Sequence, residues 1–394
     1  MIILGTMQRL LTSLTAILLG TMAAGGDELV AEDFTFASSF DGASPLYAAA
    51  VYEKESSPRP LMVVQHGYGG DRRAVGHSAA RMARRGFFCV GIDSLKKNGG
   101  VTTRYDCGGI EVMDIYDGIQ AAIKKYPDMI DPSKISIVGY SGGGGTATFA
   151  TVRFPFLFRA SMSFFGIPDY GMWNAPGVRR RNWGMPTPVT IAVGGTVAET
   201  PDKYLVRNAG LAAGNLRGRL FEMAYDEREN ICPVAMQEAF IQAVKKTGYR
   251  NLVVNISKKG DPHQWRHGHN SGQLDAAEDR FMDDIAKIDT PMPVMPPTGE
   301  LVVLGYLVTP RFTCVLGKGD DAAAQIKYEF TNDTARFVLS PMTSDNKAKA
   351  AVTLPADRLI DVRVDGQQVE IVKAGDKRKI EGTISSTMVI SFRR

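Results

Sequence analysis

The stretch Gly139-Tyr140-Ser141-Gly142-Gly143 decides how this chain is interpreted. It follows a β-branched run at 135–138, ISIV, and leads into a run of small residues at 143–150, GGGTATFA. A serine in a G-x-S-x-G pattern between a strand and a helix occupies a sharp turn that exposes its hydroxyl, and the glycines let the strand and the helix close around it. Ser141 is therefore the candidate nucleophile.

Short apolar runs and amphipathic helical patterns alternate on both sides of this stretch, from about residue 33 to residue 288. The runs are short and nearly continuous in apolar residues, which is typical of parallel strands buried on both faces. The pattern predicts an α/β fold, a mostly parallel sheet with helices on both faces. We expect strands near 61–64, 87–92, 135–138, 160–165, 220–225 and 251–256, and helices near 74–85 and 110–126.

A cluster of prolines, Pro291, Pro293, Pro296 and Pro297, marks an abrupt change in composition, and we place a linker at 289–299. Beyond it, residues 300–394 contain short apolar runs separated by turns, including Asp365-Gly366, a hairpin signal. This pattern predicts a small all-β, sandwich-like accessory domain. Its strands are expected near 301–308, 325–330, 335–339, 350–354, 360–364, 369–372 and 387–392.

The composition describes an ordinary globular protein of two domains, with 394 residues, 44% hydrophobic and 22% charged. The net charge of +4 is spread along the chain, which argues against nucleic acid as a partner. The four cysteines have no metal-ligand spacing, and Cys89 falls within a predicted strand. If the protein is exported, one or two disulfides are possible.

Residues 1–24 are expected to be a signal peptide, because Arg9 precedes an apolar stretch, 10–22, and small residues follow at 23–24. Met7 is an alternative start, and an uncleaved amphipathic anchor is the alternative interpretation. No later stretch is apolar and long enough to span a bilayer. We therefore expect a secreted or periplasmic protein with no stable membrane insertion after the signal is removed.

A second glycine-rich motif, His66-Gly67-Tyr68-Gly69-Gly70, comes directly after the predicted strand at 61–64. A glycine-lined turn at the end of a parallel strand can direct a backbone N–H into a site. We expect the amides of Tyr68 and Gly142 to form an oxyanion hole.

With both motifs present, residues 33–288 resemble the α/β-hydrolase superfamily, in its prolyl-oligopeptidase and polysaccharide-esterase-like branch. The resemblance rests on the G-x-S-x-G motif, the upstream H-G-x-G-G motif and the chain order serine, acid, histidine. It does not extend to the C-terminal domain. It implies a serine hydrolase with a catalytic triad.

The resemblance places the acid after the strand at 220–225 and the histidine after the strand at 251–256. Counting back four residues from Pro233 gives Glu229, and Asp226 at the strand end is the alternative acid. His263 is preferred as the base because a glycine precedes it and an aromatic residue follows. The competing histidines are His267 and His269.

In this interpretation Ser141 attacks an acyl carbon and water hydrolyses the acyl-enzyme, a mechanism that needs no metal or organic cofactor. Trp173, Trp183 and Arg180 are candidate substrate-binding residues, because aromatic rings stack on sugars and guanidinium groups bind carboxylates. The first hypothesis is an exported carboxylic-ester hydrolase acting on a small-molecule or polysaccharide ester, such as an acyl or uronoyl ester. The alternatives are a serine peptidase of prolyl-oligopeptidase type and a non-catalytic binding protein on a hydrolase scaffold. The sequence leaves the oligomeric state open.

Overall fold

The computed structural model describes residues 28–40, 45–54, 57–93, 107–175, 186–261, 267, 274–355, 359–374 and 377–392. The expected signal peptide, residues 1–24, lies outside these ranges. Within them, every helix is too short or too polar to cross a membrane.

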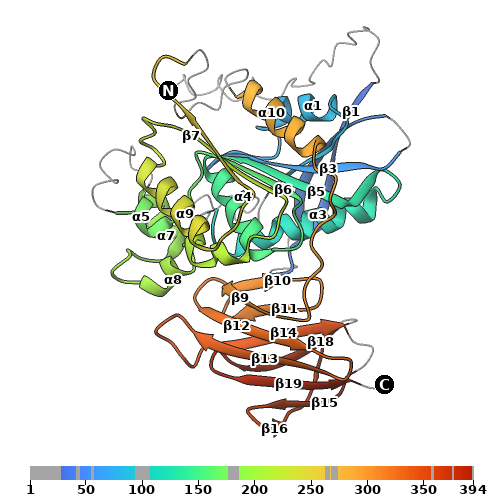
Figure 1. Cartoon of the computed structure of the whole chain (residues 1–394), viewed down its shortest axis with the longest axis vertical. Coiled ribbons are helices and arrows are strands. Elements are labelled where there is room, and N and C mark those ends of the chain that lie inside the picture. The colour runs from blue at the N-terminus through green and yellow to red at the C-terminus, as the bar shows by residue number, and fades with distance from the viewer. Residues whose placement is uncertain are drawn as a thin grey trace, which may run out of the picture.

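An eight-stranded sheet with the order β1-β2-β4-β3-β5-β6-β7-β8 forms the centre of the N-terminal part of the molecule (Figure 1). Strand β2 runs antiparallel to both of its neighbours, and all pairs from β4 to β8 are parallel. The strands are β1 (Leu29–Ala37), β2 (Pro45–Glu53), β3 (Arg59–Gln65), β4 (Phe88–Ile92), β5 (Ile130–Tyr140), β6 (Ala160–Phe164), β7 (Leu220–Asp226) and β8 (Leu252–Ser257). This is the predicted α/β-hydrolase arrangement.

Helices cover both faces of this sheet, which is why its central strands β4, β6 and β7 are buried at every position. Figure 1 shows α1 (Gly76–Ala83) and α10 (Asp275–Ala286) on one side, and α3 (Met113–Lys125), α4 (Gly142–Arg153) and α9 (Val234–Lys246) on the other. The shorter helical segments are η2 (Ile110–Val112), α5 (Tyr170–Trp173), α7 (Pro186–Val193), α8 (Pro201–Leu205) and η3 (Ala209–Asn215).

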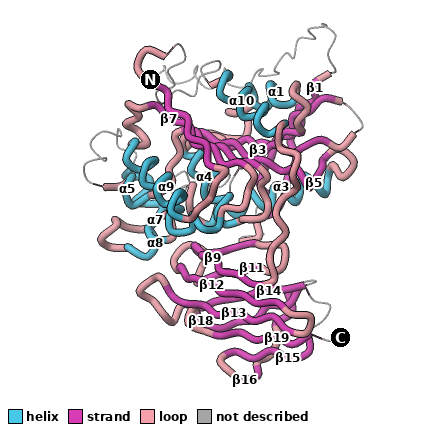
Figure 2. The backbone as a smooth tube through the Cα atoms, in the orientation of Figure 1, coloured by secondary structure: helices cyan, strands magenta, loops and turns pink. Residues whose placement is uncertain are grey.

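Residues 287–297 contain neither helix nor strand and lead to a C-terminal β-domain of eleven antiparallel strands (Figure 2). The strand order is β16-β15-β19-β13-β12-β9-β10-β11-β14-β18-β17. The chain bends at Gly305, between β9 and β10. Side chains from the strands on both sides of this bend form one apolar core. The strands are β9 (Thr298–Leu304), β10 (Tyr306–Val308), β11 (Thr313–Leu316), β12 (Ala323–Phe330), β13 (Thr334–Pro341), β14 (Lys349–Pro355), β15 (Leu359–Val364), β16 (Gln367–Gln368), β17 (Val372–Ala374), β18 (Lys377–Thr383) and β19 (Thr387–Phe392).

The β-domain differs from its sequence-based description in three places. The run at 301–308 is two strands, because Gly305 adopts a left-handed φ of 77°. A hypothetical Cβ there would lie 2.0 Å from the carbonyl oxygen of Gly319, so this bend requires glycine. The run predicted at 369–372 lies between β16 and β17 except for its last residue, Val372, which begins β17. The strands β11 and β18 lacked a clear apolar signal, since β11 spans four residues and β18 begins Lys-Arg-Lys.

Candidate active site

Ser141 lies in the sharp turn between β5 and α4, with φ 54° and ψ −118°. A positive φ is rare for a residue with a side chain and is strained unless the surroundings hold it. Here the Ser141 amide donates to the Phe164 carbonyl of β6 at 2.9 Å, and the Ser141 carbonyl accepts from the Gly145 amide at 3.0 Å. The strand and the helix together fix the turn that presents the serine hydroxyl.

Two glycines of the motif are required by close approach rather than by backbone angle. A Cβ on Gly139 would lie 2.0 Å from the Gly143 carbonyl oxygen. A Cβ on Gly143 would lie 2.3 Å from the carbonyl oxygens of both Gln65 and His66. These glycines let α4 start directly against β3 and β5, so the serine lies at the carboxyl edge of the sheet.

Ser141 contacts a histidine, and that histidine contacts a carboxylate. The Ser141 hydroxyl lies 2.9 Å from His267 Nε2, and His267 Nδ1 lies 3.0 Å from Glu229 Oε2. Ser141 is 7% exposed to solvent, whereas the Glu229 side chain is fully buried. Such a chain of contacts can transfer a proton from the hydroxyl to the imidazole while the carboxylate fixes the ring.

Glu229 is held by the turn in which it lies, between β7 and α9. Its Oε1 accepts hydrogen bonds from the amides of Ile231 at 2.7 Å and Cys232 at 3.0 Å, which leaves Oε2 directed at His267. Asp226, the alternative acid, has other partners: the Arg228 amide at 2.9 Å and the Ser257 hydroxyl at 3.2 Å. Glu229 therefore contacts the histidine that faces Ser141, whereas Asp226 forms hydrogen bonds with Arg228 and Ser257 outside this chain of contacts.

The histidine in contact with Ser141 is His267 rather than the preferred His263. His263 and His269 lie outside the described residues, as do Arg180 and Trp183. The ring of Phe165 packs against the His267 ring with centroids 4.9 Å apart. The glycine and aromatic neighbours that favoured His263 are weak markers, because they do not determine which histidine contacts Ser141.

The two expected oxyanion-hole residues lie side by side. The Tyr68 amide nitrogen is 2.8 Å from the position that a Cβ on Gly142 would occupy. Gly142 is the first residue of α4, and the first amides of a helix have no acceptor within the helix. The two residues expected to supply the oxyanion-hole amides are therefore in contact, next to Ser141 in the case of Gly142.

Two cysteines adjoin the candidate nucleophile, a feature that sequence reasoning missed. Cys107 Sγ is 2.8 Å from the Cβ position of Gly142, and Cys232 lies near enough to Ser141 for the serine hydroxyl to affect the pKa of its thiol. Burial, reinforced by the charge of Glu229, raises the pKa of Cys232 well above its ordinary value. All four cysteines, Cys89 among them, are buried thiols outside any disulfide among the described residues, so the disulfides that export would permit are absent there.

Trp173, expected to stack on a sugar, is 1% exposed. Its indole N–H donates to the Ile231 carbonyl at 2.7 Å, in the same peptide segment whose amides bind Glu229. Its ring packs on Tyr170 and lies 6.5 Å from the Tyr68 ring. This burial corrects the expected role: Trp173 supports the turn that carries Glu229 and has almost no exposed surface.

Replacing Trp173 with phenylalanine should therefore lower kcat about three- to tenfold and leave KM within about twofold. The change removes the donor to the partly buried Ile231 carbonyl, which costs about 1–3 kcal/mol of stability and loosens the turn that carries Glu229. Steady-state kinetics and a thermal unfolding scan measure both effects. A tenfold rise in KM at unchanged kcat would restore a substrate-binding role.

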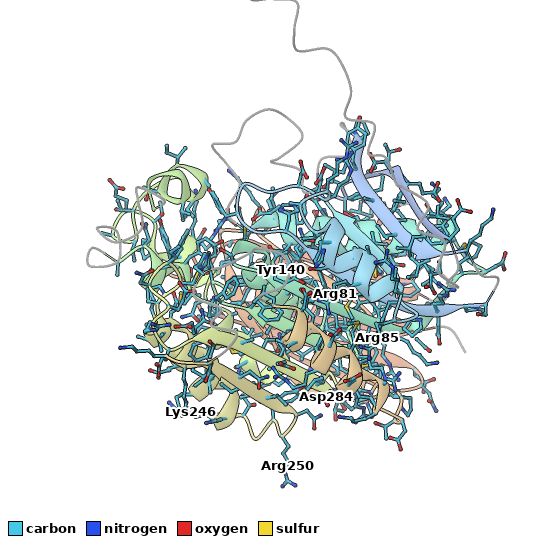
Figure 3. All side chains as sticks on the ribbon, turned by 90° about the horizontal axis from the view of Figure 1, so that it is seen from above. Arg81, Arg85, Tyr140, Lys246, Arg250 and Asp284 are labelled. Atoms are coloured by element: carbon cyan, nitrogen blue, oxygen red, sulfur yellow. The ribbon has the colours of Figure 1, made fainter. Side chains whose placement is uncertain are left out.

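Tyr140, directly before Ser141, connects the nucleophile turn to α10. Its hydroxyl donates to the buried Glu278 carboxylate at 2.6 Å, and Arg81 of α1 contacts the other Glu278 oxygen at 3.2 Å. Figure 3 shows Tyr140 and Arg81 in the interior of the view, whereas Arg250 projects from the rim. Burial raises the pKa of Glu278. A cavity of about 220 Å³ adjoins this network, between the His66–Gly70 loop, α1 and the start of α10.

A family model, the prolyl oligopeptidase family, matches residues 100–186, which include the candidate nucleophile. No curated protein sequence matches this chain.

Solved structures share the fold of the N-terminal part. The chain is similar to the acylaminoacyl peptidase of Pyrococcus horikoshii (TM-score 0.54, 21% identity, covering 67% of this chain and 43% of that one). It is also similar to a puromycin-hydrolyzing peptidase of Mycobacterium tuberculosis (TM-score 0.52, 16% identity, 67% and 41%). An acetyl xylan esterase from Paenibacillus sp. R4 aligns with a TM-score of 0.47 and 18% identity, covering 65% of this chain and 84% of that one.

The chain spans less than half the length of either peptidase. At these sequence identities the alignments show a common fold but do not indicate which substrate this chain acts on. The fold, the nucleophile turn and the family match agree: the N-terminal part of the chain has the α/β-hydrolase fold, and its residues 100–186 match the prolyl oligopeptidase family.

Proposed function

We propose that this protein is a serine hydrolase that cleaves a carboxylic ester through an acyl-enzyme. The observation that carries the proposal is the continuous contact from the Ser141 hydroxyl through His267 to Glu229, at 2.9 and 3.0 Å. A non-catalytic binding protein on a hydrolase scaffold, the other alternative from the sequence, would have no need for this geometry.

In the proposed reaction His267 Nε2 accepts the Ser141 proton as the oxygen attacks the acyl carbon. The amides of Tyr68 and Gly142 stabilise the negative charge on the carbonyl oxygen, and Glu229 stabilises the imidazolium. His267 then donates the proton to the leaving oxygen, and the alcohol departs. Water, deprotonated by His267, attacks the acyl-enzyme and releases the acid and free Ser141.

An acyl or uronoyl ester of a polysaccharide is the proposed substrate class. Trp183 and Arg180 remain its proposed contacts, since Trp173 is buried. A peptidase is the second candidate, because the family match covers the nucleophile region and the fold is shared with two peptidases. We also propose secretion or export to the periplasm, on the basis of residues 1–24.

A fluorophosphonate probe tests the chemistry independently of the substrate. The wild-type protein should gain one covalent adduct on the peptide that contains Ser141, and Ser141→Ala should gain none. Equal labelling of the two proteins would reject the proposal.

Substrate class is tested by measuring hydrolysis of acetylated xylan, a uronate ester and a prolyl amide side by side with the same enzyme preparation. The proposal expects either ester to be cleaved with the higher kcat/KM. Faster cleavage of the amide would establish the peptidase alternative.

A further inference from the structure

The C-terminal β-domain is joined to the N-terminal part through a shared core. Leu304, Tyr306, Val308 and Ala323 of the β-domain pack in the same apolar cluster as the central sheet. Asn215 of η3 also pairs with the backbone of Val302, donating at 2.7 Å and accepting at 2.9 Å. An accessory module on a flexible tether would not bury its side chains in this way.

Tyr306 of the β-domain is fully buried and contacts the N-terminal part of the molecule directly. The guanidinium carbon of Arg153 lies 4.6 Å from the centroid of the Tyr306 ring. The same ring packs on Phe154. Its hydroxyl lies 3.1 Å from Arg153 Nη1, which donates to it, and donates to the Gly109 carbonyl at 3.2 Å. One tyrosine therefore contacts both an arginine and a loop of the N-terminal part.

Arg153 is the last residue of α4, the helix that begins immediately after Ser141. It is buried, and a buried guanidinium is stable only when acceptors surround it. Its two terminal nitrogens donate to the carbonyls of Gly108 and Gly109, each at 2.8 Å. Arg153 thus links the 107–109 segment to α4 through hydrogen bonds. Tyr306 contacts both Arg153 and Gly109, and so links this segment and α4 to the β-domain.

The 107–109 segment begins at Cys107, whose Sγ packs against Gly142, and whose carbonyl accepts from Thr146 of α4 at 3.3 Å. Cys107 has a left-handed φ of 64°, which a residue with a side chain keeps only under constraint. Displacement of this segment would change the space around the Gly142 amide, the expected oxyanion donor.

We propose that Tyr306 and Arg153 are positioning residues, through which the β-domain holds the 107–109 segment against the oxyanion-hole side of Ser141. The proposal rests on the proposed function only for its effect on catalysis. It assigns the β-domain, which the sequence predicts only as an accessory domain, a part in building the site.

The test uses full-length Tyr306→Phe, which keeps the ring and removes the hydroxyl that contacts Arg153 and Gly109. The matched control is Tyr249→Phe, since the Tyr249 hydroxyl also donates to a glycine carbonyl, that of Gly218 at 2.9 Å. Gly218 lies just before β7, at the opposite end of the strand from the acid turn. Both variants lose one tyrosine hydroxyl, and only one loses it near the 107–109 segment.

Tyr306→Phe should lower kcat for p-nitrophenyl acetate about tenfold with KM within about twofold, because small displacements of catalytic groups reduce rates strongly. Hydrogen exchange measured by mass spectrometry should rise in the peptide containing 107–112. Tyr249→Phe should change neither quantity more than about twofold. Arg153→Lys, which retains the charge but not the forked pair of donors, should act in the same direction as Tyr306→Phe.

Equal kcat and equal exchange at 107–112 in Tyr306→Phe and Tyr249→Phe would overturn the proposal. The exchange measurement does not depend on activity, so it decides the positioning role even if the wild-type protein proves inactive. Inactivity combined with a failure of fluorophosphonate labelling would overturn the proposed function alone.

Discussion

Replacing His267 with alanine should lower kcat by about 10⁵-fold or more, while replacing His263 with alanine should leave kcat within about threefold. The physical reason is that a serine hydroxyl is a weak nucleophile unless a base accepts its proton as it attacks. His267 Nε2 lies 2.9 Å from the Ser141 hydroxyl and its other nitrogen is already bonded to Glu229, so its ring is held for this transfer.

Steady-state hydrolysis of p-nitrophenyl acetate measures the effect, and thermal unfolding scans of both variants establish that the folded fraction is unchanged. The two histidines are four residues apart in sequence, so His263→Ala controls for the loss of an imidazole from this segment. A large loss in His263→Ala with a small loss in His267→Ala would reverse our assignment of the base.

The contrast between these histidines shows where sequence reasoning ends. The nucleophile turn could be predicted because its requirements are local: the strand, the serine and the glycines at Gly139 and Gly143 are consecutive, and steric contacts of about 2 Å enforce them. The choice among histidines depends on which imidazole reaches the Ser141 hydroxyl and packs against the ring of Phe165. Those contacts are long-range and have no signature in residue spacing.

The predicted acid is an intermediate case, since the sequence narrows it to two residues but does not decide between them. Glu229 could be narrowed to one of two carboxylates because the turn before α9 is short and ends at Pro233. What separates it from Asp226 is the direction of the side chains, set by the Ile231 and Cys232 amides, and a one-dimensional pattern does not contain that direction. The buried position of Trp173 was missed for the same reason, because a tryptophan in a glycine- and proline-rich segment has the same composition whether it faces solvent or supports a turn.

The C-terminal domain shows a different limit. Its strands could be predicted as a class from short apolar runs and turn residues, since alternation is a local property. Its attachment through Tyr306 and Arg153 could not, because the two residues are far apart in sequence and neither is part of a motif. Removal of the domain at the proline-rich linker would expose the part of the shared core that contains Leu304 and Tyr306. For this reason point substitutions are the sharper test of what the domain does.

Glu229→Gln should lower kcat by about 10⁴-fold with little change in KM, although the glutamine has nearly the same shape. The amides of Ile231 and Cys232 both donate to Oε1, so the oxygen of the glutamine is retained at that position and its NH₂ group is directed at His267. His267 Nδ1 must then accept a hydrogen bond, which places the ring proton on Nε2, the nitrogen that faces Ser141. A protonated Nε2 cannot take the serine proton, so the substitution disables the base through its tautomer.

Asp226→Asn is the matched control, because it makes the same exchange of carboxylate for amide three residues away in the same turn. Its partners are Arg228 and Ser257, so we expect kcat within about tenfold and a loss of about 1–3 kcal/mol in unfolding free energy, since a charged hydrogen-bonding partner of Arg228 is removed. Kinetics and denaturant unfolding of the two variants separate a catalytic effect from a structural one. If Asp226→Asn lost more activity than Glu229→Gln, the acid would be Asp226, and the contact between His267 and Glu229 would have to be broken in the reacting enzyme.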